Sequence, residues 1–216
     1  MKYELVIFDL DGTLLDTLDD LAAAANSALK RHGFPAKGRD VVRRLIGNGV
    51  ASMIQRAVPE GTDEGTCADV LADFKAIYTA DYNVHTRPFP GVDALLDDLI
   101  AAGVKAAMNS NKVDAIVKAL AEAHFRDKLA LALGEQEGVP KKPAPDEANA
   151  IMSALGVLPE RTLYVGDGEA DILTAQNAGI DCVWVSWGYR RPEELPGLTI
   201  PRRADTVKEL RTFILG

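Results

Sequence analysis

Short apolar runs alternate with helical patterns along most of this chain, and this alternation limits the fold more than any other feature. Each run is four or five residues long, which suits a strand covered on both faces better than a buried helix. Helix-spaced apolar residues lie between the runs and often end at a glycine, such as Gly103 or Gly179. The predicted strands are residues 5–8, 104–108, 129–133, 162–165 and 182–185. This order predicts an α/β protein with a parallel sheet.

One long segment departs from the alternation. From about residue 15 to residue 84 there is no convincing strand, and apolar residues recur at helical spacing over 18–29, 41–58 and 68–82. We therefore predict two domains, listed here by their residues: an α/β core formed by 1–15 and 85–216, and a helical domain formed by 16–84.

Composition and charge limit the class of protein. The 216 residues are 47% hydrophobic and 26% charged, as in an ordinary globular protein. A net charge of −8 argues against a nucleic-acid partner, because such proteins usually carry a basic excess. No stretch approaches the roughly 20 apolar residues of a membrane span, so no membrane partner is expected. The first residues lack a signal-peptide layout, and Cys67 and Cys182 lie far apart, so we expect a cytoplasmic protein without disulfides.

Chemically active side chains follow four of the predicted strands. They lie in the segments 9–12, 109–112, 141–146 and 166–171. Right-handed crossovers place the carboxyl ends of parallel strands at one edge, so these segments are expected to meet there. Asp9 and Asp11 are like charges two residues apart, which a cation makes tolerable. Carboxylate oxygens suit Mg²⁺, and a hydroxyl or a lysine can donate to a substrate phosphate.

These segments resemble the motifs of the haloacid dehalogenase superfamily of phosphohydrolases. FDLDGT at 8–13 resembles motif I, Ser110 in NSNK motif II, Lys142 in KPAPD motif III and GDGEAD at 166–171 motif IV. All four occur in the family's order, and the resemblance covers essentially the whole chain. It implies a Rossmann-like core and, at residues 16–84, a helical cap domain of the C1 type that closes over the active site.

The resemblance also implies roles for the carboxylates. Asp9 would be the nucleophile that forms an aspartyl-phosphate, and Asp11 would protonate the leaving oxygen and then deprotonate the attacking water. Asp9, the backbone carbonyl of Asp11, and Asp167 would hold Mg²⁺, with Asp171 in support. Asp171 also fits a helix-capping role, and the two roles are compatible. Gly168 stands where the family commonly has serine, which removes a hydroxyl but no carboxylate.

A second group of residues is expected to bind the phosphate. It consists of Ser110, Asn111, Lys142 and Gly12. Lys141 is an alternative to its neighbour, but Lys142 is favoured because it directly precedes the Pro-x-Pro sequence.

Three residues of the helical segment are candidate substrate contacts. Arg44, Gly47 and Asn48 lie in a stretch that resembles the specificity loop of phosphoglycolate-phosphatase-like members. Glycines permit unusual backbone angles, and arginine or asparagine can meet a small anionic substrate. A plain helix junction with surface arginines is the alternative interpretation.

The expected function is Mg²⁺-dependent hydrolysis of a phosphomonoester of a small metabolite, with 2-phosphoglycolate as a candidate substrate. A sugar-phosphate mutase keeps the same core and stays open as an alternative. From a different class, a phospho-accepting receiver or binding protein also combines acidic residues, a hydroxyl and a lysine, although the helical segment disfavours it. Monomer and homodimer are both compatible with the sequence.

Overall fold

A six-stranded sheet forms the centre of the molecule. The computed structural model describes residues 2–200 and 202–216, and its main sheet has the order β5-β4-β1-β6-β7-β8. Every neighbouring pair in this sheet is parallel, which confirms the predicted α/β architecture. The strands are β1 (Leu5–Phe8), β4 (Lys105–Val113), β5 (Leu131–Glu135), β6 (Thr162–Gly166), β7 (Asp181–Val185) and β8 (Arg203–Ala204).

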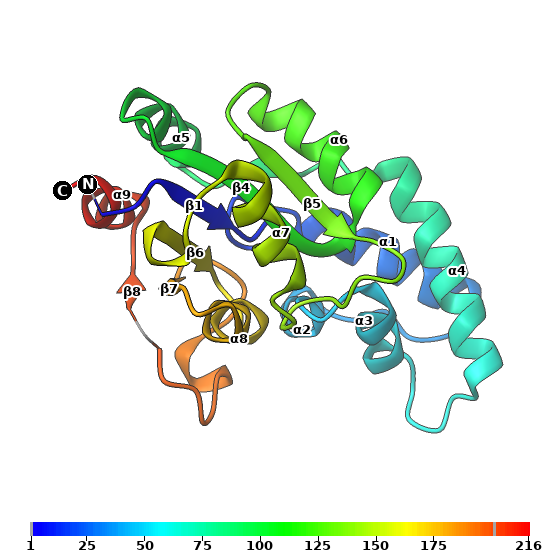
Figure 1. The fold of residues 1–216 in the computed structure, drawn as a ribbon. Helices are drawn as coiled ribbons and strands as arrows, with labels where there is room; N and C mark the ends of the chain where they lie inside the picture. Colours follow the sequence, from blue (N-terminus) through cyan, green and yellow to red (C-terminus); the bar gives the residue numbers. More distant parts are fainter. Residues whose placement is uncertain (1, 201) are drawn as a thin grey trace.

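Helices cover both faces of the sheet (Figure 1). One face packs against α5 (Val92–Ala101), α6 (Asp114–Phe125) and α9 (Val207–Leu215), and the other against α7 (Asp146–Leu155) and α8 (Glu169–Ala178). Alternate residues of β1 face opposite sides, so Val6 and Phe8 join the first cluster while Leu5 and Ile7 join the second. Burial of each large apolar side chain stabilises the fold by about 1.5–3 kcal/mol.

Four helices between β2 (Leu15–Asp16) and β3 (Arg87–Pro88) form a separate group, called here the helical insert. They are α1 (Leu18–Arg31), α2 (Arg39–Leu45), α3 (Val50–Ala57) and α4 (Glu64–Asp81). Figure 1 shows them together beyond one end of the sheet. The helical pattern over 41–58 divides into α2 and α3 because Gly47 and Gly49 have φ angles of 118° and 81°, which a right-handed helix does not allow.

Several strand predictions need correction. Residues 15–84 contain a short strand after all: β2 (Leu15–Asp16) pairs antiparallel with β3 (Arg87–Pro88). Two-residue strands have no periodicity from which to predict them, and β8 was missed for the same reason. β4 continues to Val113, with an irregularity after Asn109, so the segment 109–112 belongs to its end rather than following it. β5 begins two residues later than the sequence suggested.

The β2–β3 pair ties together the two chain segments that connect the core with the helical insert. Asp20, at the start of α1, reinforces this junction although it is only 3% exposed. Its carboxylate accepts hydrogen bonds from the amides of Val84 (3.1 Å), His85 (2.9 Å) and Thr86 (2.9 Å), and from the Thr86 hydroxyl (2.8 Å). A buried charge held by several donors is well satisfied, so Asp20 fixes where the returning segment leaves the insert.

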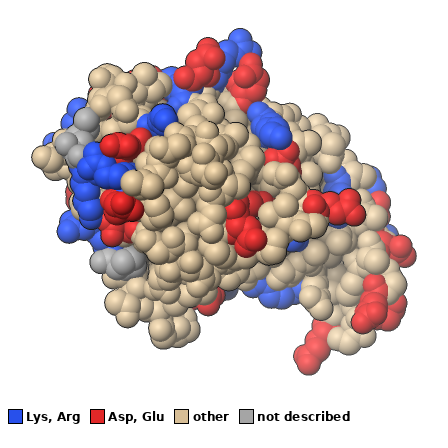
Figure 2. All heavy atoms as spheres, viewed as in Figure 1, with Lys and Arg blue, Asp and Glu red and all other residues tan. Residues whose placement is uncertain are grey.

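On the face shown in Figure 2, basic and acidic side chains lie mainly around a broad central area of other residues, and the two signs occur side by side. Among the described residues, no helix combines the length and apolarity that crossing a bilayer requires.

Replacing Asp20 tests the junction. Asp20→Ala leaves the amides of residues 84–86 without their acceptor, so the free energy of unfolding should fall by about 3 kcal/mol. Asp19→Ala is the matched control, because Asp19 is the adjacent residue and its side chain is 56% exposed. Urea denaturation of both variants measures the difference, and equal stabilities would contradict this role for Asp20.

Candidate active site

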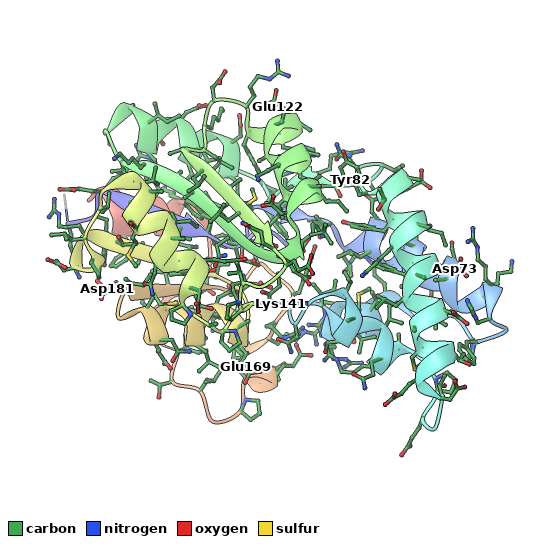
Figure 3. All side chains as sticks on the ribbon, turned by 45° about the vertical axis from the view of Figure 1, so that its right-hand side comes forward. Asp73, Tyr82, Glu122, Lys141, Glu169 and Asp181 are labelled. Atoms are coloured by element: carbon green, nitrogen blue, oxygen red, sulfur yellow. The ribbon has the colours of Figure 1, made fainter. Side chains whose placement is uncertain are left out.

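The carboxyl ends of β1, β4 and β6 surround a cavity of about 60 Å³. Core residues from all four predicted segments line it, together with residues of the helical insert between α2 and α3. In Figure 3, Lys141 and Glu169 lie on the side of the core that faces these helices. The structure thus brings the four segments together at one edge of the sheet, as their positions along the chain predicted, and the insert covers this cavity from the other side.

A buried lysine joins two of the carboxylates. Lys142 Nζ lies 2.6 Å from Asp9 Oδ1 and 2.7 Å from Asp171 Oδ1, and all three side chains are at most 9% exposed. Burial opposes the ammonium charge, but Asp171 and Asp9 outweigh it and hold the pKa of Lys142 well above its usual value. Lys141 instead pairs with Glu135 at the rim (2.7 Å). The structure thus brings Lys142, rather than Lys141, to the carboxylates.

Asp9, Asp167 and Asp171 form a compact acidic trio. Each is buried, and one oxygen from each lies within 4.8 Å of the other two. Burial, together with the neighbouring Asp171 charge, raises the pKa of Asp9 well above normal and that of Asp167 to about 7. Three carboxylates face the single ammonium group of Lys142 here, so a further positive charge would stabilise their ionised forms.

The trio fits a divalent cation that prefers oxygen ligands. Among the described residues, no hydrogen bond reaches Asp9 Oδ2 or Asp167 Oδ1, so both oxygens are available to a cation. Asp171 is more fully engaged, because Oδ1 meets Lys142 and Oδ2 accepts the Gly168 amide (2.9 Å) at the start of α8. Asp171 therefore combines helix capping, which the sequence suggested, with a contact to Lys142, which it did not.

The side chain of Asp11 lies apart from the trio. Lys112 Nζ approaches its two oxygens at 2.8 and 2.9 Å, and the Thr17 hydroxyl donates to Oδ1 at 2.5 Å. Lys112 is almost fully buried and lies over the Tyr78 ring, 4.9 Å from its centroid. Despite burial, the Asp11 charge raises the pKa of Lys112 above its usual value. Sequence reasoning assigned Lys112 no role, because its partner lies 101 residues away.

Gly12 does not line the cavity, although the sequence suggested that it binds phosphate. It packs against Asp167 instead, because a Cβ at Gly12 would come within 2.5 Å of Asp167 Oδ2. A Cβ at Gly188 would come within 2.4 Å of the same oxygen. The amide of Tyr189 donates to Asp167 Oδ2 from this side. Two glycines and one amide thus fix the orientation of Asp167.

Ser110 and Asn111 differ in how they face the cavity. Both line it, and Ser110 is 2% exposed. The Asn111 side chain is already engaged, since its amide nitrogen donates to the carbonyls of Gly47 and Lys142 (both 3.1 Å) and its oxygen accepts the Lys142 amide (2.9 Å). This geometry suits a bridge between the core and the insert better than a phosphate contact.

The three candidate substrate contacts of the insert also separate. Gly47 and Asn48 line the cavity, but Arg44 does not. The Arg44 side chain is 52% exposed and pairs with Asp40 one helical turn away (3.2 Å). Arg44 points outward because it and its neighbour Arg43 lie on different faces of α2, and Arg43 is the buried one.

Comparison with known proteins identifies the family. The model of the family described as "Haloacid dehalogenase-like hydrolase" matches residues 6–185, which includes all four motifs. The chain belongs to the haloacid dehalogenase-like hydrolases. The resemblance drawn from the motifs is thereby confirmed.

Several proteins resemble this hydrolase over most of their length. A phosphoglycolate phosphatase of Pseudomonas putida is 35% identical over 206 residues, covering 91% of this chain and 75% of that protein. A phosphoglycolate phosphatase of Aquifex aeolicus is 31% identical over 212 residues, covering 97% and 98%. A solved structure from Lactobacillus delbrueckii subsp. bulgaricus is 35% identical, covers 100% of both chains and superposes with a TM-score of 0.94.

Replacing Lys112 tests its pairing with Asp11. Lys112→Met preserves the length of the side chain but removes the charge that holds the Asp11 carboxylate. Because the family resemblance implies that Asp11 transfers protons, kcat for phosphate release from 2-phosphoglycolate is expected to fall about 10- to 100-fold, part of what acid–base catalysis contributes. Lys118→Met, which removes an exposed lysine of α6, is the control. Steady-state kinetics with thermal melting measures both effects. A folded Lys112→Met variant with wild-type kcat would contradict a role for Lys112 in catalysis.

Proposed function

We propose that this hydrolase is a Mg²⁺-dependent phosphatase that acts on small phosphate monoesters through an aspartyl-phosphate on Asp9, with 2-phosphoglycolate as its substrate. The observation that carries the proposal is the buried Asp9 carboxylate, placed in a small cavity between Lys142 and the other members of the acidic trio. The names of the curated relatives support the substrate.

Asp9, Asp167 and the backbone carbonyl of Asp11 would hold Mg²⁺, with Asp171 in support. When bound, Mg²⁺ would offset the negative charge of the carboxylates and of the phosphoryl group. Lys142 supplies a second positive charge at the same place, and the Ser110 hydroxyl can donate to a phosphoryl oxygen. Lys142 and Ser110 thus contribute to the electrostatic stabilisation that phosphoryl transfer requires.

The reaction then proceeds in two displacements. An Asp9 oxygen attacks phosphorus, the ester P–O bond breaks, and Asp11 gives its proton to the leaving oxygen. Water next attacks phosphorus and passes a proton to the Asp11 carboxylate, and the bond from phosphorus to Asp9 breaks, which releases phosphate. Lys112 and Thr17 hold Asp11 where both proton transfers require it.

The size of the cavity supports a small substrate. About 60 Å³ of space lies between the trio and the insert residues Ile46, Gly47, Asn48 and Gly49. The cysteines Cys67 and Cys182 are both free, which supports placing the enzyme in the reducing cytoplasm.

Asp9→Asn tests the nucleophile. The variant keeps the shape of the side chain and lessens charge repulsion in the trio, so it should fold normally while phosphate release falls about a thousandfold or more. Asp146→Asn, on the exposed start of α7, is the control. Phosphate release from 2-phosphoglycolate measures the loss, and analysis of the organic product separates hydrolysis from a mutase reaction. Wild-type phosphate release by Asp9→Asn would refute the mechanism.

Asp167→Asn tests the cation site. An amide is a weaker ligand than a carboxylate, so the Mg²⁺ concentration for half-maximal activity should rise about tenfold or more. The titration is performed with 2-phosphoglycolate at saturation, with Asp146→Asn again as the control. An unchanged Mg²⁺ requirement would remove Asp167 from the set of ligands.

A further inference from the structure

Two arginines cross the boundary between the core and the helical insert in opposite directions. Arg43 extends from α2 of the insert into the core loop that follows β7. Arg190 extends from that same core loop back to the insert. Both are held by several hydrogen bonds, and neither has a place in the two displacements proposed above.

Arg43 is anchored in the core. Its guanidinium donates to both oxygens of Glu194 (2.8 and 2.7 Å) and to the carbonyl of Tyr189, while Nε reaches Asp40 (2.9 Å). Only 8% of the residue is exposed. The Arg43 contact lowers the pKa of Glu194 to about 2, so the ion pair is fully formed at neutral pH. A bidentate pair of this kind specifies geometry as well as charge.

Arg190 is anchored in the insert. It donates to the carbonyl of Arg43 (3.0 Å) and to the carbonyl of Ile46, at the end of α2. The last carbonyls of a helix have no partner within the helix, and a cation there also meets the favourable end of the helix dipole. Arg190 therefore holds the backbone at the point where α2 becomes the segment Ile46–Gly49, called here the insert loop.

Asn111 holds the next residue of the same loop. Its amide donates to the carbonyl of Gly47 while it also binds the backbone of Lys142. Two consecutive carbonyls of the insert loop are thus fixed by core residues. The loop needs such support because Gly47 and Gly49, with positive φ angles, give it little stiffness of its own.

We propose that Arg43 and Arg190 are positioning residues, which together form a reciprocal clasp that holds the insert loop over the phosphate site. The clasp lets the loop discriminate among phosphate esters by the size of the leaving group. This second statement rests on the proposed phosphatase function, whereas the clasp itself does not. Arg190 also lines the cavity, so direct binding of the substrate by Arg190 is the competing explanation that the test must separate.

Hydrogen–deuterium exchange tests the clasp on the whole chain without any substrate. In Arg190→Met, peptides that contain the insert loop should exchange about tenfold faster or more, because two hydrogen bonds from a charged donor are lost. Arg43→Met should act in the same direction. Arg191→Met is the matched control. Arg191 is the next residue, its side chain is 61% exposed, and its guanidinium lies 3.7 Å from the Asp40 carboxylate. Wild-type exchange of the loop in both Arg43→Met and Arg190→Met would overturn the proposal.

A kinetic arm then tests discrimination. kcat/KM is measured for 2-phosphoglycolate and for p-nitrophenyl phosphate, whose leaving group is larger. The specificity ratio is kcat/KM for 2-phosphoglycolate divided by kcat/KM for p-nitrophenyl phosphate. Arg190→Met should lower this ratio about tenfold, mainly by raising KM for 2-phosphoglycolate, and Arg190→Lys should restore part of it. Loss of the ratio with wild-type loop exchange would mean that Arg190 binds substrate directly, and would overturn the positioning role.

The Arg43–Glu194 pair supplies the remaining control. A double-mutant cycle compares Arg43→Met, Glu194→Gln and the double variant. Their effects on exchange of the insert loop should be clearly less than additive, because both single variants break the same ion pair, and additive effects would contradict a role for this ion pair in holding the loop. If the wild-type protein released phosphate from neither ester, the proposed function would fail. The exchange data would still decide whether the clasp exists.

Discussion

The ion pairs of Lys142 with Asp9 and Asp171 are the constraint on which the rest of the site depends. Three carboxylates meet at one edge of the sheet with almost no access to water, an arrangement that is costly without positive charge. Lys142 supplies that charge, because the loop before α7 brings its ammonium group to the ends of β1 and β4. What charge remains is negative, and two carboxylate oxygens stay available, so the site suits a cation and a phosphoryl group together.

One loop of the core serves three parts of the molecule. The segment after β7 supplies the Tyr189 amide to Asp167, the Tyr189 hydroxyl to the Thr17 amide (2.7 Å) at the start of α1, and Arg190 to the insert loop. Thr17 in turn binds Asp11. Asp167, Asp11 and the insert therefore share a single support, so their relative positions are determined together rather than one by one.

The sequence predicted what depends on local pattern. Strand ends gave the positions of Asp9 and Lys142, and periodicity gave the parallel sheet and the helical insert. It could not predict β2 and β3, which are too short to show a pattern, or the pairing of Lys112 with Asp11, whose partners are 101 residues apart. Arg44 was predicted to contact substrate, but it is exposed and Arg43 is buried instead. The face of α2 that meets the core depends on how the insert packs against it, which the sequence does not show.

The central claim is that Asp9 is the residue that takes the phosphoryl group. It is tested most directly by mixing the enzyme with Mg²⁺ and 2-phosphoglycolate and quenching within milliseconds. Borohydride then reduces the acyl-phosphate, which releases phosphate and converts the phosphorylated aspartate to homoserine, and peptide mass spectrometry locates the homoserine and any phosphoryl group retained on a hydroxyl. The account predicts that the modification lies on Asp9 and disappears in Asp9→Asn. A phosphoryl group found on Asp11 or Ser110, or turnover without any covalent species, would contradict it.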